Sequence, residues 1–176
     1  MKSAKLILVL LSLGMAGLQA LAEPLQDATA AIGRKDYATA ARLLEPLAAA
    51  GNAVAQIRLA LLYYHGQGVR ESNALALQWF QRAASQGLAE AQFHLGNMHA
   101  YGMAPAAAGE DPQWLAAQWY FQAARQGHAE AQYSLGILFL AGGGVVQSVT
   151  EARKWMERAA AQGHADAKVY VDSAGR

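Results

Sequence analysis

The stretch AAGNAVAQ at residues 49–56 returns three times further along the chain. The later copies read SQGLAEAQ at 85–92, RQGHAEAQ at 125–132 and AQGHADAK at 161–168, and all four align without a gap. Their glycines, Gly51, Gly87, Gly127 and Gly163, lie 36, 40 and 36 residues apart. A period of this length indicates stacked helical units that together bury one continuous core.

Bulky and small residues recur in register with these glycines. A tryptophan stands eight residues before each of the last three glycines, and Leu43 takes this place in the first copy. The three are Trp79, Trp119 and Trp155. Small residues stand nine residues after the first three glycines, at Ala60, Gly96 and Gly136. We expect the tryptophans to pack opposite these small residues, because helices approach closely where large side chains interlock with small ones.

The segments between the links are predicted to be helical. Alanine and leucine dominate them, and of the four prolines only Pro46 falls inside a predicted helix. Each link glycine fits the left-handed residue that ends one helix before the next begins. The predicted helices span residues 25–33, 37–49, 53–64, 73–86, 89–100, 113–126, 129–140, 149–162 and 165–173. The sequence therefore predicts an all-α protein.

The recurring residues resemble those of the Sel-one-like repeat family, a relative of the tetratricopeptide repeats. The family pattern runs A-x-x-x-L-G-x-x-Y-x-x-G-x-G-V and then A-x-x-W-aromatic-x-x-A-A-x-x-G, and the resemblance covers residues 36 to about 170. It implies a right-handed α-solenoid of antiparallel helix pairs that serves as a scaffold or adaptor. We expect a capping helix pair at 23–52, then repeats over 53–176, at about 53–88, 89–128 and 129–164, with a C-terminal helix at 165–173.

The second repeat departs from this pattern. Residues 66–69 and 142–145 read GQGV and GGGV, but residues 102–105 read GMAP, and four extra residues lie between Ala104 and Pro112. Repeat proteins place such insertions in loops on one face. A functional loop at 104–112 and simple drift of a tolerant surface loop both stay open.

The first 22 residues have the layout of a cleaved secretory signal peptide. Lys2 and Lys5 precede an apolar run from Leu6 to Leu18, and small residues follow up to Ala22. A membrane anchor is the competing interpretation, but a spanning helix needs roughly 20 apolar residues and this run is shorter. We expect cleavage near Ala22, no membrane insertion afterwards, and a periplasmic or secreted protein.

The composition excludes several classes of function. The chain has 14 basic and 13 acidic residues, a formal net charge of +1, and none of the basic excess of a nucleic-acid binder. It has no cysteine, so disulfides and a lipid-modified cysteine are both excluded. Stability must therefore come from helix packing alone.

In the first helix of each repeat, one face carries residues that recur in every copy and the opposite face carries residues that differ. Recurring residues such as Ala55, Leu59 and Tyr63 fall on one side at helical spacing and predict the core. The opposite side varies among copies, and in related solenoids it lines a concave groove. We expect it to bind another exported or envelope protein, with an ordinary solvated face as the alternative. The candidate residues are Arg58, Leu61, His65, His94, Asn97, Tyr101, Ser134 and Ile137.

The histidines do not have the spacing of a metal site. His94 and His99 are five residues apart, so they diverge on a helix. His128 and His164 occupy one repeat position after the link glycine, where helix capping is a better interpretation than ligation. We therefore expect no metal and no cofactor.

No catalytic motif is present in the sequence. The run Gly142-Gly143-Gly144 lacks the Lys and Ser or Thr of a phosphate-binding loop, and its place in the repeat indicates a backbone role. We expect a binding protein, not an enzyme, with no catalytic residues. The alternative is an enzyme acting on cell-wall or β-lactam-type substrates, as claimed for cysteine-rich family members, with carboxylates such as Glu90 and Glu130.

Overall fold

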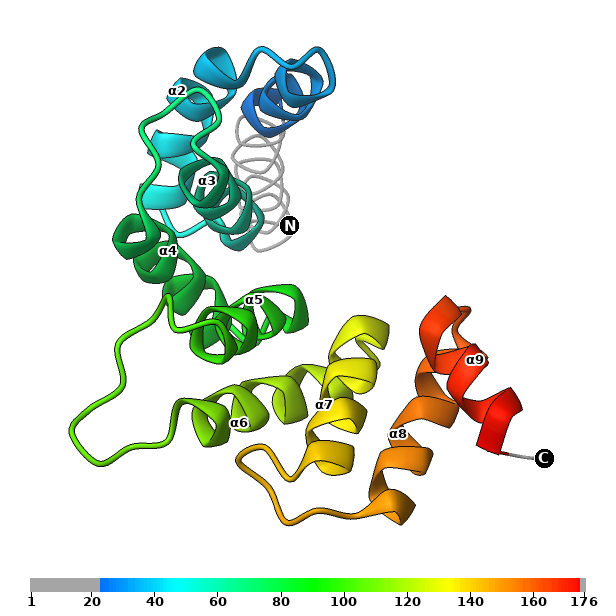
Figure 1. Ribbon diagram of the computed structural model, residues 1–176. Helices are drawn as coiled ribbons and strands as arrows, with labels where there is room; N and C mark the ends of the chain where they lie inside the picture. Colours follow the sequence, from blue (N-terminus) through cyan, green and yellow to red (C-terminus); the bar gives the residue numbers. More distant parts are fainter. Residues whose placement is uncertain (1–22, 175–176) are drawn as a thin grey trace, which may run out of the picture. The chain divides into compact units, whose positions relative to one another are not determined.

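The computed structural model describes residues 23–174, and these residues form helices and no strand (Figure 1). A helix over 23–33 precedes α2 (Tyr37–Ala49), α3 (Ala53–His65), α4 (Asn73–Ser85), α5 (Ala89–Ala100), α6 (Pro112–Arg125), α7 (Ala129–Ala141), α8 (Val149–Ala161) and α9 (Ala165–Ala174). Every helix begins and ends within two residues of its prediction. The all-α solenoid of helix pairs is confirmed, whereas the predicted signal peptide at 1–22 lies outside the described residues.

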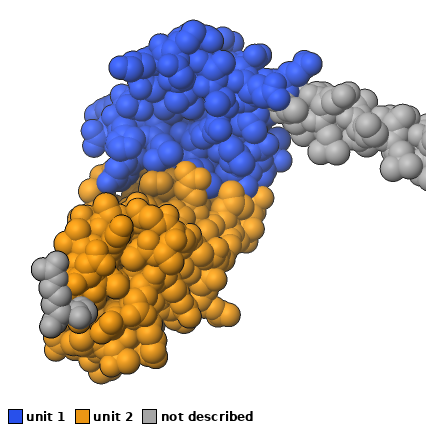
Figure 2. Space-filling model, turned by 90° about the vertical axis from the view of Figure 1, so that its right-hand side faces the viewer, with its two compact units in different colours: residues 1–72 blue, residues 73–176 orange. Residues whose placement is uncertain are grey.

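The chain divides into two compact units, residues 1–72 and residues 73–176 (Figure 2). In the first unit α2 packs on α3, and in the second unit each helix from α4 to α9 packs on the next one in the sequence. Contacts between neighbours in sequence are the rule for a repeat protein. Within residues 23–174, no helix is both long enough and apolar enough to cross a membrane.

The links between repeats end one helix and begin the next as predicted. Gly127 has a φ of +91°, a left-handed conformation that suits glycine. The following residue then caps the new helix: the Asn52 side chain accepts a hydrogen bond from the Ala55 N–H at 2.9 Å, and His128 Nδ1 accepts one from the Ala131 N–H at 3.3 Å. The predicted capping role of His128 is confirmed.

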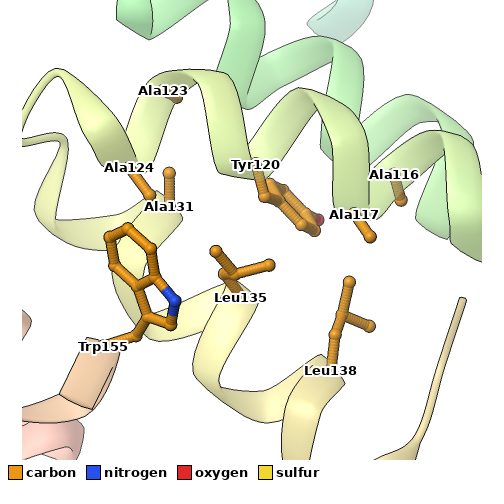
Figure 3. Packing of buried hydrophobic residues seen from close by; sticks show 9 residues of the cluster. All are labelled: Ala116, Ala117, Tyr120, Ala123, Ala124, Ala131, Leu135, Leu138 and Trp155. Carbon is orange, nitrogen blue, oxygen red and sulfur yellow. The ribbon is translucent and has the colours of Figure 1, made fainter. Parts of the chain in front are cut away.

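The core of the second unit lies between consecutive helices. Tyr120 of α6, Leu135 of α7 and Trp155 of α8 are all buried, and the Trp155 indole lies beside Leu135 and the small side chains of Ala124 and Ala131 (Figure 3). Alanines fill the positions where the helix backbones come closest, so large side chains alternate with small ones.

The predicted partner of the small residues was wrong by one position. A Cβ atom built on Gly96 would lie 2.5 Å from the Tyr120 ring, and one built on Gly136 would lie 2.9 Å from the Met156 methyl group. The side chain that packs on each glycine is therefore the residue after the tryptophan. Trp119 is half-buried and Trp155 lies against Phe121, because consecutive residues of a helix point about 100° apart.

Buried glutamines connect the repeats, a feature that the sequence analysis missed. Gln132 is buried, and its Nε2 donates to the Ala124 carbonyl at 3.0 Å. Its Oε1 accepts a 2.8 Å bond from Gln162, and Gln92 accepts the same bond from Gln126 one repeat earlier. A buried amide needs such partners, so each glutamine fixes the link of the following repeat.

The third glycine of the loop after α7, Gly144, lies against the start of α6. A Cβ atom on Gly144 would lie 2.2 Å from the Trp114 backbone nitrogen, and Gly68 has an equally close contact with Tyr37. Ala104 replaces this glycine in the second repeat. There the loop takes another course, and the N–H groups of Met103 and Ala104 both donate to the Met98 carbonyl. The insertion at 104–112 thus accompanies the loss of the glycine.

The last helix differs from α5 and α7 at two positions where those helices contact the next repeat. Lys168 stands where α5 and α7 have their buried glutamines, and Asp172 stands where they have Gly96 and Gly136. Both side chains are exposed. The inner side of α9 is apolar, since Ala167, Tyr170 and Val171 pack on α8 and α7 around Met156.

Candidate functional site

Three helices of the second unit surround a cavity of about 400 Å³. α5 contributes its last residue and its C-cap, α6 contributes two polar side chains, and α7 contributes four residues. The lining residues are Ala100, Tyr101, Gln113, Tyr120, Tyr133, Ser134, Ile137 and Leu138. The lining is aromatic and neutral, with hydroxyl and amide groups among apolar side chains, which is the usual composition of a binding pocket.

The Tyr120 hydroxyl organises the polar part of this cavity. It donates a 2.8 Å hydrogen bond to Asn97 Oδ1. Burial raises the pKa of Tyr120 well above its ordinary value, nearby Tyr101 raises it further, and a hydrogen bond with Ser134 opposes the rise. The phenol therefore stays protonated and holds the residues of α5 and α7 in place.

The structure brings together four of the predicted binding residues. Tyr101, Ser134 and Ile137 line the cavity, and Asn97 is bonded to its Tyr120. Tyr101 and Ile137 are large apolar residues with 70% and 40% of their surface exposed. His94 does not line the cavity, because its ring stacks on Phe80 with centroids 4.7 Å apart.

The other three candidates belong to α3 in the first unit. The Arg58 guanidinium donates to the Thr29 hydroxyl, so this side chain helps to hold the helix at 23–33. Leu61 is half-buried, whereas His65 is exposed and lies edge-on to Tyr64. A binding role for these three residues stays a prediction.

A second cavity, of about 360 Å³, lies at the start of α7 and α9. Its lining includes Glu130, Tyr133, His164 and Asp166. His164 Nε2 lies 2.9 Å from Glu130 Oε2, and the His164 ring stacks on Tyr133 with centroids 4.3 Å apart. Tyr133 belongs to the lining of both cavities. We call the two cavities together the Tyr133 groove.

Gln113, Tyr120 and Tyr133 also line the first cavity, although they were not predicted as binding residues. Tyr120 and Tyr133 occupy repeat positions that carry packing residues in the other copies, such as Phe80 and Phe93, so the repeat pattern does not mark them as lining residues. The hydroxyl groups were the available signal, because a buried tyrosine hydroxyl needs a polar partner that a phenylalanine does not.

The histidines serve as caps and packing residues. Besides capping α7, His128 stacks on Phe93, and burial lowers its pKa although Glu90 and Glu130 oppose the shift. His164 accepts a bond from the Ala167 N–H at the start of α9. Among residues 23–174, no group of three or more His, Cys, Asp or Glu side chains is placed to hold a metal ion.

Comparison with known proteins identifies the repeat. A family described as the Sel1 repeat matches residues 30–52, 53–88, 89–128 and 129–164. The chain belongs to the Sel1 repeat family. Sel1 repeats are typical of protein-interaction scaffolds. No match was found among curated proteins.

Solved structures of Sel1 repeat proteins resemble this chain. A Sel1 repeat protein from Oxalobacter formigenes is 32% identical with a TM-score of 0.76, covering 84% of this chain and 57% of its own. A protective antigen of uropathogenic Escherichia coli with an SLR fold is 29% identical with a TM-score of 0.79, covering 87% and 33%. Cysteine-rich protein B of Helicobacter pylori, at 23% identity, a TM-score of 0.54 and coverage of 82% and 94%, shares the fold. This chain thus spans less than two thirds of the length of each of the first two proteins.

Proposed function

We propose that this Sel1 repeat protein is an exported adaptor that binds a segment of another envelope protein through the variable face of its first helices. One observation carries the proposal. Residues that differ from repeat to repeat, Tyr101, Ser134 and Ile137, line a cavity of about 400 Å³ instead of packing in the core. Side chains that are free of the repeat pattern and gathered around one cavity are suited to recognition.

The chemistry of the cavity favours binding over turnover. Its lining consists of tyrosines, one serine, one glutamine and aliphatic residues, and it contains neither a carboxylate nor a histidine. Hydrolysis of a cell-wall bond needs a positioned acid and base, and these groups would have to come from outside the cavity. Exposed Tyr101 and Ile137 instead provide the kind of apolar anchor on which interfaces depend.

Site-specific photocrosslinking tests this proposal in cells. A photoreactive amino acid at Ile137 is expected to capture a partner protein, whereas the same group at Glu157, on the exposed side of α8, captures none. Equal capture at both positions, or capture at neither, would contradict the groove. Amino-terminal analysis of the purified protein tests export separately, because cleavage near Ala22 is expected.

A further inference from the structure

We infer that the Tyr133 groove selects a cationic peptide segment, in which an apolar side chain lies about three residues from a lysine or arginine. This inference rests on the proposed function and names the chemistry of the partner. The apolar side chain would occupy the cavity lined by Tyr101, Ser134 and Ile137. The basic side chain would reach the cavity lined by Glu130 and Asp166.

The charge of the groove determines this choice of partner. Glu130 and Asp166 are exposed, and the Glu130 side chain has 62% of its surface accessible. The linings of the two cavities contain no lysine and no arginine. Apart from His164, which is bonded to Glu130, the titratable groups of this lining that carry charge are the two carboxylates, which would repel an acidic segment and attract a basic one.

The carboxylate of Glu130 is held in position before any partner arrives. His164 Nε2 lies 2.9 Å from Glu130 Oε2, and the His164 ring is fixed by its stacking on Tyr133 and by its bond from the Ala167 N–H. A preorganised group loses less conformational entropy on binding than a free surface side chain. Glu130 is thus better suited to bind a cation than an isolated surface carboxylate.

The spacing of the two cavities sets the spacing in the partner. Glu130 and Ile137 lie seven residues apart on α7, and at 1.5 Å per residue this separation is about 10 Å along the helix. An extended chain advances about 3.3 Å per residue, so about three residues span that distance. Tyr133 lies between the two positions in the sequence of α7 and belongs to the lining of both cavities.

Selection from random dodecapeptides displayed on phage tests the inference with the full chain as bait. Enriched peptides are expected to carry Phe, Tyr, Leu or Ile two to four residues from Lys or Arg. Enrichment of peptides without a nearby basic residue would leave the proposed function standing and overturn this inference. Absence of any enrichment over the Ile137→Asp variant would contradict both.

Charge variants then test the contact directly with a fluorescent synthetic copy of the most enriched peptide. Glu130→Gln and Asp166→Asn should each weaken binding about threefold, and together about tenfold. Glu157→Gln is the matched control, because it removes the same charge from an ion pair with Arg153 on α8 and should not change the affinity. Equal effects of the control and the groove variants would overturn the inference.

Salt dependence separates the two parts of the groove. Raising the NaCl concentration from about 50 mM to about 300 mM should weaken binding to the wild type several-fold, but should weaken binding to the double charge variant less. Ile137→Ser should lower the affinity about tenfold and keep the salt dependence of the wild type. Concentration-dependent dimers that Ile137→Asp abolishes would assign the groove to a second copy of this chain and overturn the inference.

Discussion

Gly144 and Gly127 both have a positive φ, but their surroundings differ. Gly127 has a φ of +91° and nothing within 4 Å of an added Cβ atom, whereas a Cβ on Gly144 would lie 2.2 Å from the backbone of Trp114. A non-glycine residue in this conformation costs about 1 to 2 kcal/mol, and a backbone clash adds to that cost. Substitution of Gly127 therefore measures conformational strain alone, whereas substitution of Gly144 measures strain together with a backbone clash.

We predict that Gly144→Ala lowers the free energy of unfolding by about 3 kcal/mol or more, because the loop must move away from α6. Gly127→Ala, the matched control, should cost about 1 to 2 kcal/mol. Urea unfolding followed by circular dichroism measures both. Equal losses for the two variants would show that the close contact with Trp114 does not restrain the loop.

His99 is a buried histidine whose Nδ1 has no hydrogen-bond partner among the described residues. Burial lowers its pKa from the ordinary value of 6.5, and Glu110 opposes the shift in part. As the pH falls below about 6.5, the unfolded chain binds a proton at this histidine more readily than the folded chain does. The free energy of unfolding should therefore decrease on acidification, and His128 adds to this decrease because burial lowers its pKa as well.

Replacement of His99 by Phe, the residue at the equivalent position 139, should weaken this acid sensitivity. The melting temperature of the variant is expected to fall less than that of the wild type between about pH 7.5 and about pH 5.5. Differential scanning calorimetry at the two pH values provides the measurement. An unchanged difference between them would mean that His99 accepts its proton as readily in the folded chain as in the unfolded one.

At the scale of the helices, buried glutamines hold successive repeats together. Gln132 of α7 bonds the Ala124 carbonyl at the end of α6 and the Gln162 side chain after α8. One side chain thus connects three helices. Its loss would remove both bonds, but the Ala124 carbonyl also accepts from the Gly127 N–H and Gln162 is exposed. Each lost bond therefore costs about 0.5 to 1.5 kcal/mol.

We predict that Gln132→Leu destabilises the protein by about 1 to 3 kcal/mol, since leucine fills the space but makes neither hydrogen bond. Gln118→Leu, at an exposed residue of α6, is the control and should change stability by less than about 0.5 kcal/mol. Chemical denaturation of both variants measures the difference. If Gln132→Leu loses no more stability than Gln118→Leu, the hydrogen bonds of Gln132 do not hold the repeats together.

The helices were predictable from the sequence, but their contacts were predictable only in part. Alanine content, link glycines and the repeat fixed every helix to within two residues. The choice between Trp119 and Tyr120 as the partner of Gly96 depends on a rotation of about 100° around one helix, which repeat spacing does not determine. Tyr120 and Tyr133 were not predicted as site residues. Each occupies a packing position of the repeat and also lines the cavity.

At the scale of the whole chain, stability is distributed through contacts between sequence neighbours. α9 covers Met156 and Ala159 of α8 with Ala167, Tyr170 and Val171. Each unit of a repeat protein contacts only its neighbours, so removal of one helix destabilises the adjacent repeat first. Loss of the last helix should therefore weaken the second unit more than the first.

Deletion of residues 162–176 tests this expectation. Amides of α7 and α8 should exchange with deuterium much faster in the shortened chain, whereas those of α2 and α3 should keep their protection. Hydrogen exchange followed by mass spectrometry resolves the two regions. A uniform loss of protection along the chain would indicate one cooperative unit and contradict the assignment of stability to neighbouring repeats.

The charges on α9 also affect how copies of the protein meet. In α5 and α7 a glycine and a buried glutamine contact the next repeat. At the same positions α9 has Asp172 and Lys168. Docking of another copy's helices there would take both charges out of water, at a cost of several kcal/mol for each ion left unpaired. Open-ended growth into filaments, a hazard of any head-to-tail arrangement, is thereby disfavoured on this face of α9.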